Sequence, residues 1–131
     1  MKLVLDASAA VAASLAEDGW ALLAGETLVA PPLLLSEAIS VLHENQWRNE
    51  ISADVAGLAR DRLLSAPVRF LAPRELHFEA WRIADRLGWA RTYDAEYVAL
   101  SRILDVPLLT LDERLRRGAG HLVSIIGPTD L

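Results

Sequence analysis

Four acidic residues stand where carboxylates could act together in this sequence: Asp6, Glu37, Asp94 and Asp112. Two unit charges about 4 Å apart repel by about 4 kcal/mol at an effective dielectric constant of roughly 20, so clustered carboxylates need protons or divalent cations among them. Oxygen ligands in a chain with no cysteine and only three histidines favour Mg²⁺ or Mn²⁺ over zinc. Mg²⁺ keeps several waters, which leaves room for a phosphate oxygen and an attacking water. Such a cluster is typical of phosphodiester hydrolysis.

Short apolar runs alternate with segments of helical periodicity along the chain. The runs are typical of strands buried on both faces of a parallel sheet. Strands are expected at 2–6, 27–30, 68–72, 106–112 and 122–126, and helices at 7–16, 33–47, 51–65, 76–87 and 93–104. This alternation predicts an α/β fold with a mostly parallel sheet of four or five strands, in one domain over residues 1–131.

The helices carry recognisable ends and apolar faces. Ser52 is the expected N-cap of the helix 51–65, and Gly88 is expected to end the helix 76–87. Two apolar stripes are predicted, one on each of the helices 33–47 and 76–87. Their members are Leu35, Ala38, Ile39 and Leu42 in the first, and Leu76, Ala80, Trp81, Ile83, Ala84 and Leu87 in the second.

This fold would bring the four acids to one edge of the sheet. Asp6 and Asp112 each follow a strand, and ligand sites in open parallel sheets lie outside the carboxyl ends of the strands. Helices that follow strands begin at that edge, so Glu37 and Asp94 could join them. We therefore expect one acidic cleft.

Each acid also has an ordinary structural interpretation. Asp6 or Ser8 could cap the helix 7–16, and Asp112 could cap a helix that begins at residue 113. Asp94 could compensate the dipole of its helix in the first turn. Glu37 could be a solvated charge opposite the apolar stripe of its helix. Pattern alone leaves these alternatives open.

Composition restricts the class of protein. No apolar stretch reaches the ~18 residues of a membrane span, and residues 2–5 do not form a signal peptide, so a cytoplasmic protein is expected. The absence of cysteine excludes disulfides and thiolate metal sites. A net charge of −5 gives no overall attraction to nucleic acid, which would need a local basic patch or bound cations. The arginines of 113-ERLRRG-118 could form such a patch or a solvated helix face.

Four segments together resemble the PIN-domain family, and within it the VapC toxins: 4-VLDASA-9, 36-SEAISVL-42, 93-YDAEYVALS-101 and 110-TLDERL-115. The resemblance implies a three-layer PIN fold and an Mg²⁺- or Mn²⁺-dependent endoribonuclease that leaves a 5′-phosphate and a 3′-hydroxyl. It assigns the acidic pocket to Asp6, Glu37, Asp94 and Asp112. Asp6, Asp94 and Asp112 would hold the metal, and Glu37 would complete the shell or orient the attacking water. Ser8 and Thr110 would support them by hydrogen bonds, whereas Glu96 and Glu113 would not be primary ligands.

The same resemblance implies partners. An RNA substrate, a cognate antitoxin protein and a second copy of the chain in a homodimer are expected. The helical hairpin 33–65, with Trp47 at the end of its first arm, is the candidate antitoxin groove; alternatively Trp47 packs in the protein's own core or dimer interface. Core or interface packing is expected of Trp20, Trp81 and Trp89, with base stacking by an exposed one as the alternative. Surface or packing roles are expected of the histidines, His43, His77 and His121. Contacts with RNA are expected of some arginines, among Arg91, Arg114, Arg116 and Arg117.

Two rival classes remain for comparison. A phosphoaspartate-type α/β domain also places Asp at strand ends and uses Mg²⁺, but it ordinarily needs a lysine near the phosphoryl group. The only lysine, Lys2, lies at the opposite end of the first strand from Asp6. A catalytically silent PIN-fold binding module is the second rival, and the presence of all four acids argues against it.

Overall fold

The sheet of the protein is built from five parallel strands in the order β3-β2-β1-β4-β5. The computed structural model describes all residues, 1–131. The strands are β1 (Lys2–Leu5), β2 (Thr27–Ala30), β3 (Val68–Phe70), β4 (Leu108–Leu109) and β5 (Ile125–Ile126). The central strand β1 is apolar because it is covered on both faces, and Leu3, Val4 and Leu5 have no exposed surface. The predicted parallel α/β fold is confirmed.

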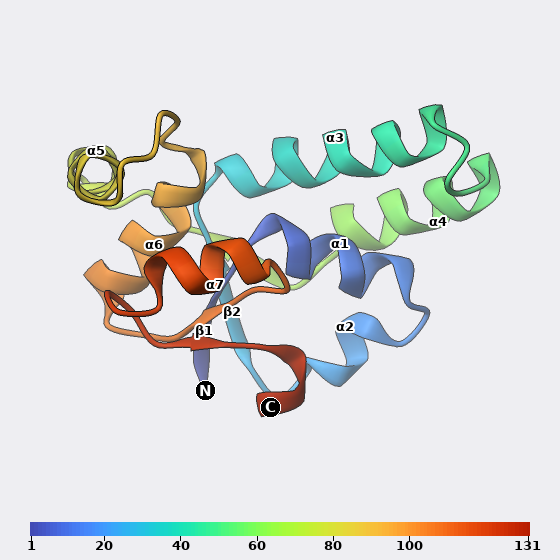
Figure 1. Ribbon diagram of the computed structural model, residues 1–131. Helices are drawn as coiled ribbons and strands as arrows, with labels where there is room; N and C mark the ends of the chain where they lie inside the picture. The colour runs from blue at the N-terminus through green and yellow to red at the C-terminus, as the bar shows by residue number, and fades with distance from the viewer.

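Helices flank this sheet on both faces (Figure 1). They are α1 (Ala7–Leu15), α2 (Gly19–Leu22), α3 (Leu33–Trp47), α4 (Ala53–Leu64), α5 (Leu76–Leu87), α6 (Tyr93–Leu104), α7 (Glu113–Ala119) and the 3-10 turn η1 (Pro128–Asp130). One group consists of α1, α3 and α4, which contact one another, and α5 packs on α6, which contacts β1 and β4. Helices α3 and α4 form a long hairpin that extends away from the sheet in Figure 1. No helix combines the length and the apolar character needed to cross a membrane.

The ends of the helices follow the expected capping chemistry. The Ser52 hydroxyl accepts a 3.1 Å hydrogen bond from the Val55 N–H at the start of α4. Gly88 ends α5 in the left-handed conformation at φ 71°, which a residue without a Cβ adopts at little cost. Helix α6 occupies the predicted residues, whereas the short helix α2 was not predicted from the sequence.

Strands β3, β4 and β5 are shorter than the predicted 68–72, 106–112 and 122–126. Side chains take over the backbone donors after Thr110: the Leu111 N–H donates to Ser8 Oγ and the Asp112 N–H to Thr110 Oγ1, each at 3.0 Å. These donors therefore leave the ladder, and the chain turns toward the carboxyl end of β1.

The predicted apolar stripes of α3 and α5 are confirmed only in part. The face of α3 that is fully buried consists of Leu34, Ala38 and Leu42, with Leu35 and Ile39 only partly buried beside it. On α5, Trp81 is 66% exposed. At about 100° per residue, Trp81 lies roughly 140° around the helix from Leu76, outside the stripe that faces the core. Trp81 therefore does not pack in the core of this chain, and a role at an interface stays a prediction.

Candidate active site

Asp6, Glu37, Asp94 and Asp112 all line one cavity of about 400 Å³ at the carboxyl ends of β1 and β4. β1 and β4 are neighbours, with Leu5 paired to Leu109, so the segments that follow them emerge side by side. The starts of α3 and α6 supply the other two acids. The structure thus brings together four residues that are up to 106 positions apart in sequence.

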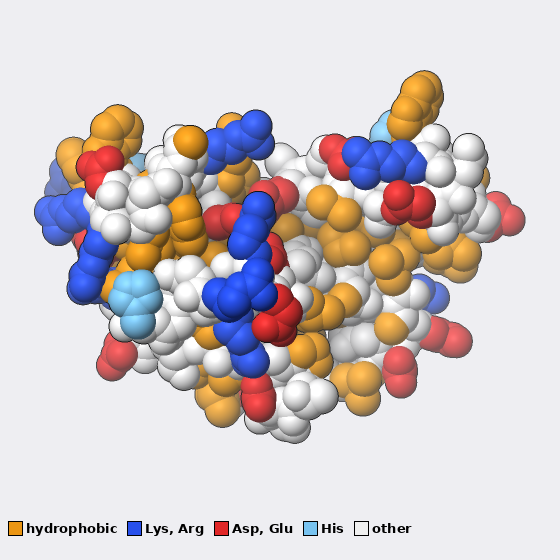
Figure 2. Space-filling model, in the orientation of Figure 1, with side chains coloured by type: hydrophobic (Ala, Val, Ile, Leu, Met, Phe, Trp, Pro, Cys, Tyr) orange, Lys and Arg blue, Asp and Glu red, His pale blue; other side chains and the backbone are white.

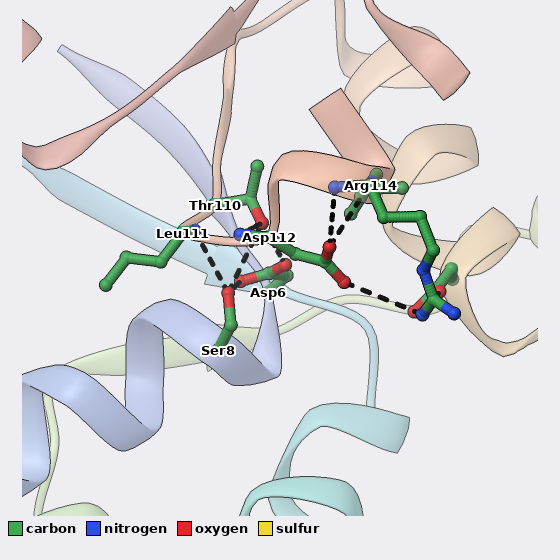
Figure 3. Close-up of polar contacts among 8 residues, drawn as sticks. Asp6, Ser8, Thr110, Leu111, Asp112 and Arg114 are labelled. Carbon is green, nitrogen blue, oxygen red and sulfur yellow. Dashed lines mark hydrogen bonds and ion pairs between the residues drawn. The ribbon is translucent and has the colours of Figure 1, made fainter. Parts of the chain in front are cut away.

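Asp6 is both the N-cap of α1 and a wall of this cavity. Figure 3 shows the Ser8 and Thr110 side chains at its carboxylate. Its Oδ1 accepts hydrogen bonds from Ser8 Oγ at 2.7 Å and from the Ala9 N–H at 3.0 Å, and its Oδ2 accepts one from the Thr110 hydroxyl. Burial raises the pKa of Asp6; these hydrogen bonds oppose the rise, and the charge of Asp112 adds to it. The capping and site interpretations are therefore compatible.

The Ser8 and Thr110 hydroxyls connect the start of α1 to the segment between β4 and α7. They lie 3.3 Å apart, and both bond Asp6, as expected of supporting residues. Because they also accept from the Leu111 and Asp112 N–H groups, they fix the backbone that carries Asp112.

Asp112 caps α7 with only one of its oxygens. Its Oδ1 accepts from the Arg114 N–H at 2.9 Å and from the Leu115 N–H at 3.2 Å. Its Oδ2 lies 3.8 Å from Arg114 Nη2. One carboxylate can therefore hold the helix start and still offer an oxygen to the cavity.

Glu37 is fixed by a residue that the sequence did not single out. The Tyr97 hydroxyl donates a 2.6 Å hydrogen bond to Glu37 Oε1. Burial raises the pKa of Glu37, the bond from Tyr97 opposes that rise, and the charges of Asp94 and Glu96 add to it. The sequence spacing could have identified Tyr97, because it lies three residues after Asp94 and therefore on the same side of α6. Glu37 is not the solvated charge that the helical pattern allowed.

Asp94 and Arg114 form the charged side of the cavity. Burial and the charge of Asp112 raise the pKa of Asp94, while the Arg114 guanidinium lowers it. Arg114 Nη2 lies 3.8 Å from Asp94 Oδ2, the same distance as from Asp112. Glu96 instead points toward α5, where its carboxylate is 3.7 Å from His77 Nε2. Burial raises the pKa of Glu96, and His77 opposes this.

The donor set fits a hard divalent cation, although the side chains do not enclose one. No three His, Cys, Asp or Glu side chains lie close enough together to hold a metal ion in this arrangement. Hydroxyl groups hold Asp6 and Glu37, and a single guanidinium separates Asp94 from Asp112. Carboxylate oxygens without thiolate or imidazole suit Mg²⁺ or Mn²⁺. The metal-ligand roles of Asp6, Asp94 and Asp112 stay a prediction.

Basic side chains run in a line across the middle of the face in Figure 2, over α7, with acidic side chains on both sides. Arg114 is at the acidic cavity. Arg116 is directed instead toward Asp130, 3.4 Å away, and the carbonyl of Ile125. Arg117 is exposed, and Arg91 lines an adjoining cavity.

The remaining aromatic and histidine side chains divide between packing and exposure. Trp20 donates to Ser14 Oγ at 3.2 Å and, like Trp89, packs against the core. Trp47 is 79% exposed, so the interpretation that it packs in the protein's own core was wrong. The three histidines are exposed, as expected: His43, His77 and His121.

Comparison with known proteins assigns the family. A family model described as PIN domain matches residues 3–120. Ribonuclease VapC12 of Mycobacterium tuberculosis is 35% identical over 94% of this chain and 96% of its own length, and VapC ribonuclease Mb0985 of Mycobacterium bovis is 37% identical over 86% and 87%.

Two crystal structures have the same fold. PAE2754 from Pyrobaculum aerophilum aligns with a TM-score of 0.76 at 21% identity, over 99% of this chain and 91% of that one. VapBC2 from Rickettsia felis, bound to a DNA fragment from its promoter, aligns with a TM-score of 0.68 at 14% identity, over 97% and 98%. With the family model and the curated relatives, they lead to one assignment: the chain belongs to the PIN-domain family, in its VapC branch.

Proposed function

We propose that this protein is a metal-dependent endoribonuclease that acts as the toxin of a toxin–antitoxin pair. The observation that carries the proposal is the convergence of Asp6, Glu37, Asp94 and Asp112 on one cavity. The curated relatives are named ribonucleases and are covered almost completely by the alignment. A shared activity over the whole length of this chain accounts for both observations.

Asp6, Asp94 and Asp112 would hold Mg²⁺ or Mn²⁺ in this proposal. A bound cation of this kind supplies Lewis acidity at a phosphoryl oxygen and lowers the pKa of a water ligand. The protein's contribution is the position of its own groups. Glu37, held by Tyr97, can orient a water and accept its proton because burial already raises the pKa of that carboxylate.

Arg114 would act on the phosphate. Its guanidinium already lies between two carboxylates at the mouth of the cavity, 3.8 Å from each. A phosphodiester that enters there brings negative charge to which the guanidinium can donate, and charge stabilisation of this kind favours the transition state of phosphoryl transfer.

The proposed partners are an antitoxin and a second copy of the chain. The structural relative from Rickettsia felis is a VapBC complex, which supports a protein partner of the antitoxin kind. In this chain the α3–α4 hairpin offers exposed apolar side chains, among them Trp47, Val55 and Leu58, to such a partner. We propose that the antitoxin binds this hairpin and that the second copy of the chain binds a different surface.

The rival classes find less support. Lys2 begins β1 and Asp6 follows its end, so the only lysine is far from the acidic cavity that a phosphoaspartate domain would use. A silent binding module would not need four acids in one cavity, three of which, Asp6, Glu37 and Asp94, have pKa values raised by burial.

The test is cleavage of labelled RNA with Mg²⁺ or Mn²⁺ by the wild type and by the variants Asp6→Asn and Asp94→Asn. Both variants should fold but lose cleavage and growth toxicity, and EDTA should abolish wild-type cleavage until Mg²⁺ or Mn²⁺ is restored. Asp85→Asn, at an exposed acid of α5, is the control and should cleave normally. Cleavage retained by both variants would contradict the assignment of Asp6 and Asp94 to the active site.

A further inference from the structure

A second cavity of about 540 Å³ adjoins the acidic cavity. The two cavities share Glu37, Asp94 and Arg114 among their lining residues, so they open toward each other. Its volume lies within the roughly 300–1,000 Å³ typical of small-molecule sites. We call it the Tyr93 cavity, after the aromatic residue at the start of α6 that lines it.

The wall of the Tyr93 cavity away from the acids is aromatic and basic. It includes Trp89 and Arg91 of the segment between α5 and α6, and Tyr93, the first residue of α6. Tyr93 is 52% exposed, so much of its side chain is free to contact a ligand. Arg91 is exposed and forms no ion pair with an acid of the protein, in contrast to Arg114. This guanidinium is therefore available to an anion from outside.

Packing fixes this wall in place. Gly88 makes the turn out of α5 at φ 71°, and the Trp89 N–H donates to the Ala84 carbonyl at 2.9 Å. The Trp89 ring lies directly against Gly118 of α7, where an added Cβ would come within 3.0 Å of Cζ2. The loop is therefore held between α5 and α7, and the cavity exists before a ligand binds.

We propose that the Tyr93 cavity binds the nucleotide next to the scissile phosphate of single-stranded RNA, with its base stacked on Tyr93 and its phosphate paired with Arg91. The inference rests on the proposed nuclease function. Aromatic rings stack on any unpaired base, and arginine binds phosphate oxygens in a two-pronged geometry. A ligand with a phosphate at the acidic end and a base at the aromatic end matches both cavities at once.

The overall charge makes such a local site necessary. A net charge of −5 repels a polyanion, so affinity for RNA has to come from particular cations and stacking surfaces. Arg91 and Tyr93 supply one of each beside the acidic cavity. A base inside a duplex is already stacked and paired, so it cannot reach Tyr93. The site therefore selects single strands.

The experiment measures binding of fluorescein-labelled oligouridylate and oligoadenylate, about 12 nucleotides long, by anisotropy in EDTA over a range of salt. Tyr93→Ala should weaken binding about 10-fold, the scale of one stacked base, and Tyr93→Phe should restore it. Arg91→Ala should lower the slope of log K against log salt by about 0.7, the share of one phosphate contact on a single strand, and Arg91→Lys should keep the slope. Tyr93→Ala should leave the slope unchanged.

Phe78→Ala and Arg48→Ala are the matched controls, an exposed aromatic residue and an exposed arginine that do not line the cavity. They should bind RNA as the wild type does. The inference is overturned if both Tyr93→Ala and Arg91→Ala bind the oligonucleotides with wild-type affinity. It is also overturned if an RNA duplex competes as well as a single strand does, or if the wild type does not bind the oligonucleotides at all. Normal affinity with lost self-association would identify the cavity as a protein contact and also overturn it. Cleavage by the wild type in Mg²⁺, measured in parallel, tests the nuclease proposal separately.

Discussion

The Tyr97 hydroxyl lies 2.6 Å from Glu37 Oε1 and joins two helices that are 60 residues apart in the chain. Tyr97 itself is 1% exposed, and burial together with the neighbouring Glu37 carboxylate raises its pKa, so its hydroxyl remains a proton donor. Glu37 is therefore held in one orientation by a neutral group that cannot move away.

Tyr97→Phe should change the pH dependence of cleavage. The hydrogen bond from Tyr97 lowers the pKa of Glu37 against the effect of burial, so its loss raises that pKa further. If Glu37 accepts a proton during the reaction, the acidic limb of the pH profile of kcat/KM moves to higher pH. Activity at neutral pH should fall about 10-fold or more.

Tyr93→Phe is the control for this substitution. It removes the same hydroxyl from a neighbouring residue of α6 that makes no bond to Glu37. Its pH profile should match the wild type. An unshifted acidic limb in Tyr97→Phe would show that Glu37 does not titrate in the step that limits the rate.

Asp6→Asn should stabilise the protein at neutral pH. Burial holds the folded pKa of Asp6 above its unfolded value, so the folded state binds this proton more tightly. The wild type therefore gains stability from this residue as the pH falls through the folded pKa, and loses it as the pH rises. Asparagine removes the buried charge and should raise the free energy of unfolding by about 0.5–2 kcal/mol.

Urea unfolding in EDTA checks this result at pH 7 and at acidic pH. The advantage of Asp6→Asn should shrink as the pH falls, because protonation also removes the buried charge from the wild type. Ser8→Ala provides the comparison, because it removes a hydrogen bond that favours the charged form of Asp6 and should destabilise the protein at neutral pH. If Asp6→Asn is less stable than the wild type at neutral pH, the hydrogen bonds to the Asp6 carboxylate outweigh the cost of burying its charge, and the prediction is wrong.

Arg114→Ala should increase the affinity for Mg²⁺. The guanidinium interacts with Asp94 and Asp112 at 3.8 Å, so a divalent cation that uses these oxygens has to displace it. The side chain of Arg114 is mostly exposed, so the gain is small, about 2- to 5-fold, the scale of an exposed ion pair.

Calorimetric titration with Mg²⁺ measures this gain, and Arg117→Ala, an exposed arginine of the same helix, is the control. RNA cleavage should fall in Arg114→Ala even while metal affinity rises, because the phosphate loses a donor. An unchanged Mg²⁺ affinity would mean that the cation does not use the oxygens next to Arg114.

The sheet and the positions of the acids were predictable because they depend on local patterns. A continuous apolar run that ends in Asp6 is typical of a buried parallel strand, and parallel strands bring their carboxyl ends to one edge. Capping preferences located the starts of α4 and α7 at Ser52 and Asp112. These signals lie within a few residues of the feature that they predict.

Other features depend on contacts between distant segments. The pairing of Tyr97 with Glu37 requires the packing of α6 beside α3, which no local pattern specifies. The early end of β4 results from hydroxyl groups that capture the backbone donors after Thr110. Both of these features needed the three-dimensional arrangement. The exposure of Trp81 did not, because the spacing along α5 already places it roughly 140° around the helix from Leu76.

Trp47→Ala should weaken the binding of the antitoxin without reducing RNA cleavage by the free toxin. The side chain is 79% exposed at the end of α3, and an exposed tryptophan buried by a partner is a frequent energetic centre of an interface. A loss of at least 2 kcal/mol, roughly 30-fold in affinity, is expected.

Trp81→Ala is the control for this substitution. Trp81 is 66% exposed on α5, which lies on the other side of the sheet from the α3–α4 hairpin (Figure 1). Co-expression with the product of an adjacent small reading frame should rescue growth for the wild type and Trp81→Ala, but not for Trp47→Ala. Rescue of Trp47→Ala together with failure of Trp81→Ala would move the antitoxin site to α5, and it would do so without affecting the assignment of the acidic cavity.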